Sequence, residues 1–210
     1  MNVYQFLYKT LRRVISGPLY RVKVTGTENI PKNGPVILCS NHTAMMDVLV
    51  LISSTPRQIR FMAKKEAFSM PFLGKLIATC GAFPVDRAGM DVGAIKKAIS
   101  ILSEGEIMGI FPQGTRCPRV HPKETYEKLH GGVAMIAVRS KATILPVCIE
   151  TEGHKLKLFH KTRVRFGKPI PFEEYTKDGA TKEQYGKITE QAFDRVCALY
   201  EESRKENGVK

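Results

Sequence analysis

Residues 35–47 read Pro-Val-Ile-Leu-Cys-Ser-Asn-His-Thr-Ala-Met-Met-Asp, an apolar run that leads to a histidine and, five positions later, an aspartate. A short continuous apolar run is typical of a strand that is buried on both faces of a sheet. Two side chains five positions apart on one helix would point roughly 140° apart. His42 and Asp47 can therefore meet only if His42 precedes a helix and Asp47 lies in its first turn, with Thr43 as the expected N-cap.

The His42–Asp47 pair has two interpretations. Histidine exchanges a proton near neutral pH, and a carboxylate on its other ring nitrogen fixes the tautomer and the ring orientation, so the pair can work as a general base. In the structural alternative, a half-buried histidine follows a strand and the helix dipole favours the aspartate. Spacing alone favours this alternative, and the rest of the chain must decide.

Strands and helices alternate on both sides of this stretch. The patterns predict strands over 20–25, 36–39, 59–63, 81–85, 107–111, 143–149 and 163–166, and helices over 45–54, 71–79, 91–103, 133–138 and 182–204, with a polar loop from 111 to 131. This alternation predicts an α/β fold with a mixed, largely parallel sheet flanked by helices. A chain of 210 residues is expected to form a single domain with a substantial core.

The charge and cysteine content narrow the possible partners. Lys and Arg number 33 against 20 acidic residues, a net charge of +13, which favours a polyanionic partner. The chain has no Trp and no basic-aromatic repeat, so no nucleic acid is expected as a partner. Scattered cysteines without a CxxC pair predict reduced thiols in the core and no metal; they are Cys39, Cys80, Cys117, Cys148 and Cys197.

The first 23 residues contain five basic residues and no acidic one, and apolar residues follow a helical stripe from Val3 to Ile15. A basic amphipathic helix can lie in a membrane interface or pack on the protein's own core. The charge asymmetry favours the membrane, so we expect residues 1–19 to be an amphipathic membrane-associating segment and 20–210 to be the remaining domain. No apolar run reaches the ~18 residues that span a bilayer, so we expect a peripheral or monotopic protein.

Two arginines follow two further predicted strands. Residues 81–87 read Gly-Ala-Phe-Pro-Val-Asp-Arg, and residues 110–116 read Ile-Phe-Pro-Gln-Gly-Thr-Arg. An arginine at a strand end is usually a solvated charge, and the residues around Gln113 are also those that shape turns. Near a strand-end histidine, however, Arg87 and Arg116 can clamp a phosphate through paired hydrogen bonds. A base beside such a clamp suits proton abstraction from a hydroxyl of a phosphorylated substrate.

In order and spacing, residues 41–47, 81–87, 111–116 and 144–147 (Ile-Leu-Pro-Val) resemble the four motif blocks of the glycerolipid acyltransferases, in particular the bacterial enzymes that act on 1-acyl-sn-glycerol-3-phosphate. The resemblance extends over about residues 20–170. It implies the glycerolipid acyltransferase fold for residues 20–210. It also implies phospholipid biosynthesis, in which an acyl thioester acylates the sn-2 hydroxyl of lysophosphatidic acid to give phosphatidic acid.

The resemblance also implies roles for individual residues. His42 would be the general base of an HX4D motif, Asp47 would hold its imidazole, and the substrate alkoxide would attack the thioester directly. The phosphate would be held by Arg87 and Arg116, in a pocket shaped by Gly114, Thr115 and Gln113, and Pro146 would help line the acyl-donor site. The expected partners are lysophosphatidic acid, acyl-CoA or acyl carrier protein as co-substrate, and an anionic membrane at its cytoplasmic face. No cofactor or metal is expected.

This chain departs from the family pattern at Gln113, where the family block usually has glutamate. The change removes a negative charge and adds amide donors, and we expect it to tune the choice of substrate. Two alternatives remain open. One is the same chemistry on glycerol-3-phosphate or another lysophospholipid, and the other is a non-catalytic module that binds lipids or anions.

Overall fold

The computed structural model describes residues 3–15, 21–86, 91–151 and 160–206. Within them, seven strands form one sheet in the order β1-β7-β6-β2-β5-β3-β4. Their bounds are β1 (Val22–Thr25), β2 (Val36–Ser40), β3 (Ile59–Lys64), β4 (Phe83–Val85), β5 (Ile107–Ile110), β6 (Thr143–Thr151) and β7 (Thr162–Phe166). The five strands from β6 to β4 are parallel, whereas β7 runs antiparallel to β6 and carries β1 parallel to itself. The predicted mixed, largely parallel sheet is confirmed.

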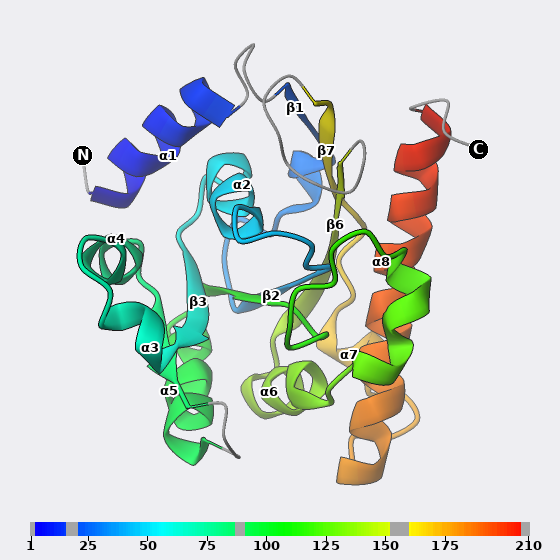
Figure 1. Ribbon diagram of the computed structural model, residues 1–210. Helices are drawn as coiled ribbons and strands as arrows, with labels where there is room; N and C mark the ends of the chain where they lie inside the picture. The colour runs from blue at the N-terminus through cyan, green and yellow to red at the C-terminus, as the bar shows by residue number, and fades with distance from the viewer. Residues whose placement is uncertain (1–2, 16–20, 87–90, 152–159, 207–210) are drawn as a thin grey trace.

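Helices cover both faces of the sheet (Figure 1). They are α1 (Val3–Ile15), α2 (Asp47–Ser54), α3 (Lys65–Phe68), α4 (Leu73–Thr79), α5 (Val92–Ser103), α6 (Gly132–Ser140), α7 (Phe172–Tyr175) and α8 (Tyr185–Glu206), with short 3-10 turns η1 (Thr27–Asn29), η2 (Pro122–Lys128) and η4 (Lys182–Gln184). Helices α1 and α2 pack on one face, and α5, α6 and α8 pack on the other. The fold is thus a three-layer α/β domain.

Strand β2 explains the unbroken apolar run of the sequence. Val36 and Leu38 point into the core shared with α1 and α2, while Ile37 and Cys39 point into the core shared with α5, α6 and α8. All four are 0% exposed. Because both faces of a central parallel strand are buried, the strand needs apolar residues at every position and shows no alternation.

The structure corrects the predicted helix start. Helix α2 begins at Asp47, and Thr43 does not cap it; the N-cap is Met46, which makes no side-chain hydrogen bond. Asp47 itself accepts the backbone N–H groups of Thr43 and Ala44. The predicted loop from 111 to 131 contains η2, and α3 and α7 were not predicted because four residues are too few to show a helical period.

All five cysteines are buried free thiols, which confirms their prediction as core side chains. Burial raises the pKa of the Cys39 and Cys148 thiols to about 12, so both remain protonated at neutral pH. None of the described helices combines the length and the hydrophobicity that a bilayer-spanning segment needs.

Helix α1 packs on the domain with one face only. Tyr4 is 3% exposed, and its hydroxyl lies 3.1 Å from the carbonyl oxygen of Thr55 and 2.8 Å from that of Arg57. The outer face leaves Phe6 and Val14 about half exposed, next to three basic residues of the same helix. The core-packing interpretation is therefore correct for the inner face. The membrane association predicted for this segment stays a prediction and concerns the outer face.

Candidate active site

The parallel sheet brings two of the sequence blocks to one edge. Strands β2 and β5 are neighbours, with Cys39 opposite Ile110. His42 follows the end of β2, and Gln113 follows the end of β5. Because carboxyl ends of adjacent parallel strands meet at the same edge, the loops after these strands come together, as they do at the ligand sites of many α/β sheets.

His42 and Asp47 form the predicted pair. His42 Nδ1 lies 2.9 Å from Asp47 Oδ2, and the same oxygen accepts the N–H groups of Thr43 (2.6 Å) and Ala44 (2.8 Å). Asp47 is 1% exposed, whereas the His42 side chain is 16% exposed. Since a carboxylate can only accept, Nδ1 carries the proton in neutral His42, and Nε2 keeps the lone pair of a base.

Aromatic stacking fixes the plane of the imidazole. The His42 ring lies 4.0 Å from the ring of Phe111 at an interplanar angle of 14°, and Phe111 is stacked in turn on Phe61 at 6.1 Å. Phe61 has room because residue 109 is glycine; a Cβ there would lie 2.1 Å from the Phe61 ring. The ring of His42 is thus oriented by packing as well as by Asp47.

Gln113 holds the backbone of His42. Its Oε1 accepts the His42 N–H at 2.7 Å, and its Nε2 donates to Thr125 Oγ1 at 2.9 Å. The Thr125 hydroxyl in turn donates its proton to the carbonyl of Pro122 at 2.7 Å. Gln113 is 2% exposed. Because both ends of the buried amide are engaged within the protein, these contacts give Gln113 a positioning role; its predicted place in the phosphate pocket stays a prediction.

The loop that carries Arg116 is fastened directly to His42. The N–H of Cys117 donates to the His42 carbonyl at 2.8 Å, and the preceding Thr115 and Arg116 are exposed. Gly114 has φ +64°, a conformation that favours glycine, and a Cβ there would lie 2.8 Å from the ring of His130. Arg116 is therefore carried by a loop anchored beside the pair, and its predicted role in binding the phosphate stays a prediction.

The two remaining predicted site residues are Arg87 and Pro146. Arg87 lies outside the described residues. Pro146 is buried in β6 opposite Cys39, and its carbonyl accepts the N–H of Gly167 at 2.8 Å. The predicted role of Pro146 at the acyl-donor site stays a prediction.

Reasoning from the sequence missed Asn41, Phe111 and Thr125 as parts of the site. Both ends of the Asn41 amide pair with the backbone of Ile149 at 2.8 Å, so β2 stays attached to β6 up to the residue before His42. Asn41 and Phe111 lie inside two of the four motif blocks, so their place in the sequence could have marked them. Thr125 lies in a segment without hydrophobic periodicity, and nothing in the sequence marks it.

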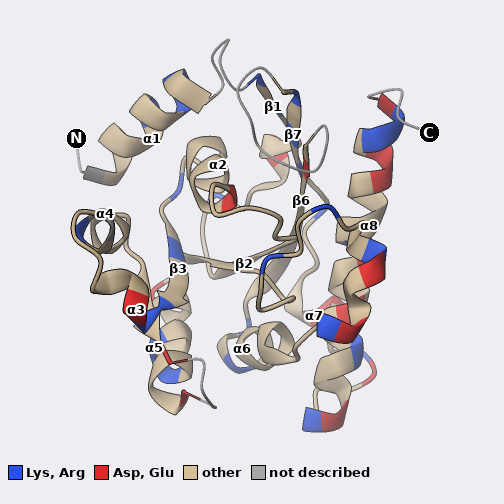
Figure 2. Cartoon of the chain, viewed as in Figure 1, with Lys and Arg blue, Asp and Glu red and all other residues tan. Residues whose placement is uncertain are grey.

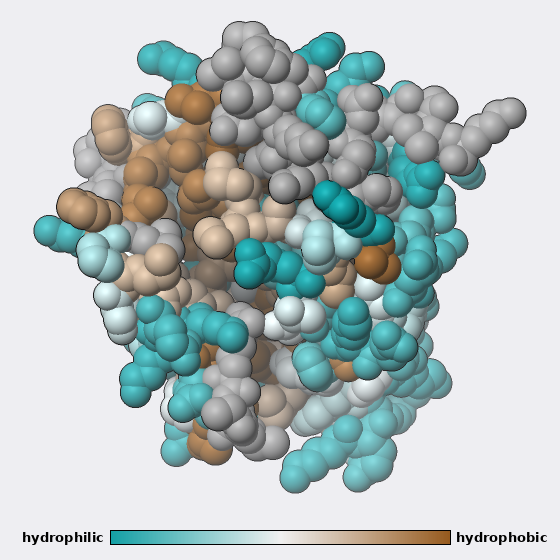
Figure 3. All heavy atoms as spheres, viewed as in Figure 1, coloured by the Kyte–Doolittle hydropathy of each residue, from teal (hydrophilic) through white to brown (hydrophobic). Residues whose placement is uncertain are grey.

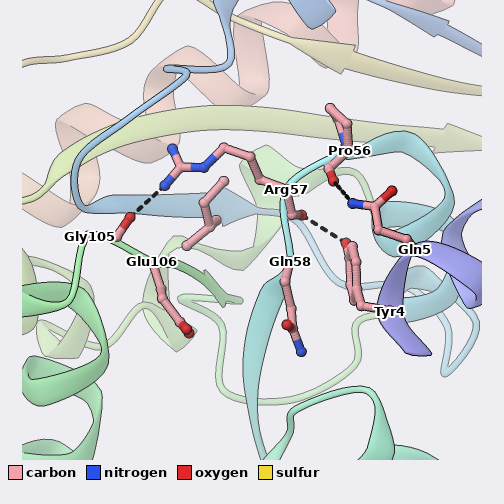
Figure 4. A pocket seen from close by; sticks show the side chains of 8 residues that line it. Tyr4, Gln5, Pro56, Arg57, Gln58, Gly105 and Glu106 are labelled. Carbon is pink, nitrogen blue, oxygen red and sulfur yellow. Dashed lines mark hydrogen bonds between the residues drawn. The ribbon is translucent and has the colours of Figure 1, made fainter. Parts of the chain in front are cut away.

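A separate hollow lies at the opposite edge of the sheet, where β3 and β5 begin (Figure 4). Its main feature is Arg57, whose guanidinium donates to the carbonyls of Pro31 (2.6 Å), Gly34 (3.0 Å) and Gly105 (2.5 Å). Partial burial lowers the pKa of Arg57. Because the guanidinium ties three backbone segments together, this hollow is part of the scaffold rather than a second reactive site.

Comparison with known proteins adds independent information. A family model described as Acyltransferase matches residues 21–150. The chain is 32% identical over 200 residues to the 1-acyl-sn-glycerol-3-phosphate acyltransferase of Bacillus subtilis, covering 94% of this chain and 96% of that protein. It is 34% identical over 156 residues to the protein of the same name from Streptococcus pneumoniae, covering 72% of this chain and 56% of that one.

A solved structure shows the same fold. The crystal structure of the 1-acyl-sn-glycerophosphate (LPA) acyltransferase PlsC from Thermotoga maritima matches with a TM-score of 0.70 at 25% sequence identity, and the match covers 95% of this chain and 79% of that one. The sheet and its flanking helices are therefore shared over nearly the whole length.

Proposed function

The chain belongs to the acyltransferase family, and we propose that it transfers an acyl group from an acyl thioester to the sn-2 hydroxyl of 1-acyl-sn-glycerol-3-phosphate. The product is phosphatidic acid, an intermediate of phospholipid biosynthesis. The observation that carries the chemistry is the convergence of three N–H donors, one of them from His42, on the buried Oδ2 of Asp47. This arrangement fixes the tautomer of His42 and leaves its Nε2 as a base at the edge of the sheet where β2 and β5 end.

The proposed reaction is a direct transfer. His42 Nε2 accepts the proton of the sn-2 hydroxyl as the oxygen attacks the thioester carbonyl, and Asp47 stabilises the imidazolium that forms. The C–S bond of the tetrahedral intermediate then breaks, and the imidazolium returns the proton to the departing thiolate. One ester bond forms, one thioester bond breaks, and the histidine ends as it began. The step requires no covalent acyl-enzyme.

Arg116 and Arg87 are proposed to hold the phosphate, with Gly114 and Thr115 shaping the loop around it. A dianionic phosphate suits two guanidinium groups, each of which can donate two parallel hydrogen bonds. The geometry supports this role for Arg116, because the N–H of the next residue, Cys117, donates a hydrogen bond to the His42 carbonyl. The proposed acyl donor is acyl-CoA or an acyl carrier protein thioester, and Pro146 is proposed to help line the site that binds it.

A panel of acceptors tests this function. The purified protein is given an acyl thioester and either 1-acyl-sn-glycerol-3-phosphate, glycerol-3-phosphate or a lysophospholipid without a phosphomonoester, and products are identified by mass spectrometry. We expect the first acceptor to give the highest kcat/KM. Faster turnover of either other acceptor would reassign the substrate within the family. Binding without turnover across the panel, with both types of donor, would identify a non-catalytic lipid-binding module.

Replacing Gln113 by glutamate is expected to make stability depend on pH. The only proton of the Thr125 hydroxyl is donated to the Pro122 carbonyl, so Thr125 Oγ1 presents lone pairs to residue 113. A carboxylate there would face an acceptor, whereas a protonated carboxyl can donate to Thr125 Oγ1 as the amide does. The folded-state pKa of the new glutamate is then raised, so the variant approaches the wild type at low pH. It loses about 1–3 kcal/mol in the free energy of unfolding as pH rises through that pKa.

Urea unfolding from acidic to neutral pH measures this effect, and Gln191→Glu on the exposed surface of α8 is the matched control. The control is expected to follow the wild type at each pH. If Gln113→Glu also followed it, the Gln113–Thr125 hydrogen bond would have no energetic importance.

We also propose that the outer face of α1 holds the protein at the cytoplasmic face of the membrane. Removing the whole helix would be a poor test, because Tyr4 belongs to the core. The variant with Phe6→Ser and Val14→Ser changes only the exposed face and is expected to bind anionic vesicles about ten-fold more weakly, because each exposed apolar side chain contributes to insertion. Vesicle co-sedimentation measures the change, and unaltered binding would show that α1 is purely structural.

A further inference from the structure

The connection between α3 and α4 exposes large apolar side chains. Residues 69–72 (Ser-Met-Pro-Phe) form a tip, on which Phe72 is 91% exposed and Met70 53%. Leu76, on the helix that follows, is 42% exposed. Single exposed apolar residues are ordinary on a protein surface, but three within seven positions of one short hairpin mark a contact surface.

The backbone holds the tip away from the protein. Phe72 has φ +61°, which is unfavourable for a residue with a Cβ and belongs here to a sharp turn. Gly74 completes this turn, because a Cβ there would lie 2.1 Å from the carbonyl oxygen of Phe68. Helix α4 thus starts in close contact with the end of α3, and the aromatic ring of Phe72 is left in solvent.

The hairpin emerges at the same edge of the sheet as the catalytic pair. Helix α3 starts directly where β3 ends, and β3 is the neighbour of β5, whose carboxyl end leads to Gln113. Met45, three residues after His42, is 62% exposed. In Figure 3, apolar side chains gather on the face formed by α1, α2 and α4, while hydrophilic ones cover most of the remaining visible surface. The tip is therefore part of a larger apolar face that borders the site.

The charges around this face are mainly positive. Residues 64–79 contain Lys64, Lys65 and Lys75, all exposed, against one acidic residue, Glu66. On α1 the charged residues are all basic, whereas α8 carries acidic and basic residues side by side (Figure 2). An apolar tip with an aromatic side chain, bordered by lysines, is complementary to the interface of an anionic bilayer, where rings insert and ammonium groups meet phosphates.

We propose that the α3–α4 hairpin is a second membrane contact of this protein, in addition to α1. Phe72 and Met70 insert into the interface of an anionic bilayer, and Lys75 lies among the headgroups. Since the hairpin and His42 share one edge of the sheet, this contact brings the site to the lipid surface, where an acceptor with an acyl chain resides. Only this last consequence rests on the proposed function; the contact itself does not.

Vesicle binding of the full chain tests the proposal. Vesicles of phosphatidylcholine with and without phosphatidylglycerol are mixed with the wild type, with a Phe72→Ser/Met70→Ser variant, and with the control Val92→Ser. Val92 is also 53% exposed but lies at the start of α5. We expect the tip variant to bind the anionic vesicles at least about ten-fold more weakly, from the transfer free energies of the two side chains, and the control to bind like the wild type.

Melting temperatures of the three proteins are expected to agree, because both changes are on exposed side chains. Binding is measured without turnover, so its result is independent of the proposed reaction. Wild-type vesicle binding by the tip variant would overturn the proposal. So would a loss of binding to acyl carrier protein, or of self-association in sedimentation velocity, with vesicle binding unchanged, since either result would assign the tip to a protein partner.

Discussion

The His42→Ala variant is expected to lose about 10²–10⁴-fold in kcat/KM, the usual contribution of a positioned general base. Its fold should survive, because Asp47 keeps the N–H groups of Thr43 and Ala44 and the start of α2 is unchanged. Steady-state kinetics with 1-acyl-sn-glycerol-3-phosphate and an acyl thioester measures the loss. A melting curve checks the fold.

Two further variants separate the base from its surroundings. His42→Gln keeps an amide that can reach Asp47 but cannot accept a proton at neutral pH, so its loss is expected to be as large. His121→Ala removes a histidine that packs on Tyr200 of α8, and it should retain activity within a few-fold. If His42→Ala were equally mild, His42 would not be the base.

The Asp47→Asn variant is expected to lose about 10²–10⁴-fold in kcat with a smaller change in KM, because the amide can neither fix the His42 tautomer as strictly nor balance the imidazolium. It should also be less stable, by about 1–3 kcal/mol, since three N–H groups lose a charged acceptor. Parallel kinetics and urea unfolding measure the two effects.

Asp91→Asn is the matched control, because Asp91 also lies at the start of a helix and accepts two backbone N–H groups, those of Ala94 and Asp86. It is expected to change stability without a comparable change in kcat. Equal kinetic losses in both variants would show that Asp47 acts only through the stability of its helix.

The sheet was predictable because its central strands have a strong and simple pattern. Val36 to Cys39 are buried on both faces, so the run is apolar throughout, and the long amphipathic helices α5 and α8 show a clear period. The pairing of His42 with Asp47 followed from geometry, because a spacing of five excludes a meeting within one straight helix. The reaction class came from the order of four motif blocks, which no single block could provide.

The features that were not predicted depend on tertiary contacts. Thr43 has a good capping side chain, but α2 begins four residues later at Asp47, and the Asp47 carboxylate accepts the N–H groups of Thr43 and Ala44 in the loop before the helix. The sequence does not show that the Gln113 amide is held by Thr125, because this contact depends on the position of η2 in the fold. The α3–α4 tip was also missed, because exposure of Phe72 is a property of the folded surface and not of the sequence pattern.

The proposed reaction is a direct acyl transfer to the sn-2 hydroxyl with His42 as the base. The most direct measurement gives the purified protein an isotopically labelled acyl thioester with 1-acyl-sn-glycerol-3-phosphate and follows the label and the free thiol by mass spectrometry. We expect one phosphatidic acid, labelled at sn-2, for each thiol released, and a rate at least about 10²-fold lower in the His42→Ala variant. Label retained on the protein as a kinetically competent intermediate, or equal rates for the two proteins, would contradict it.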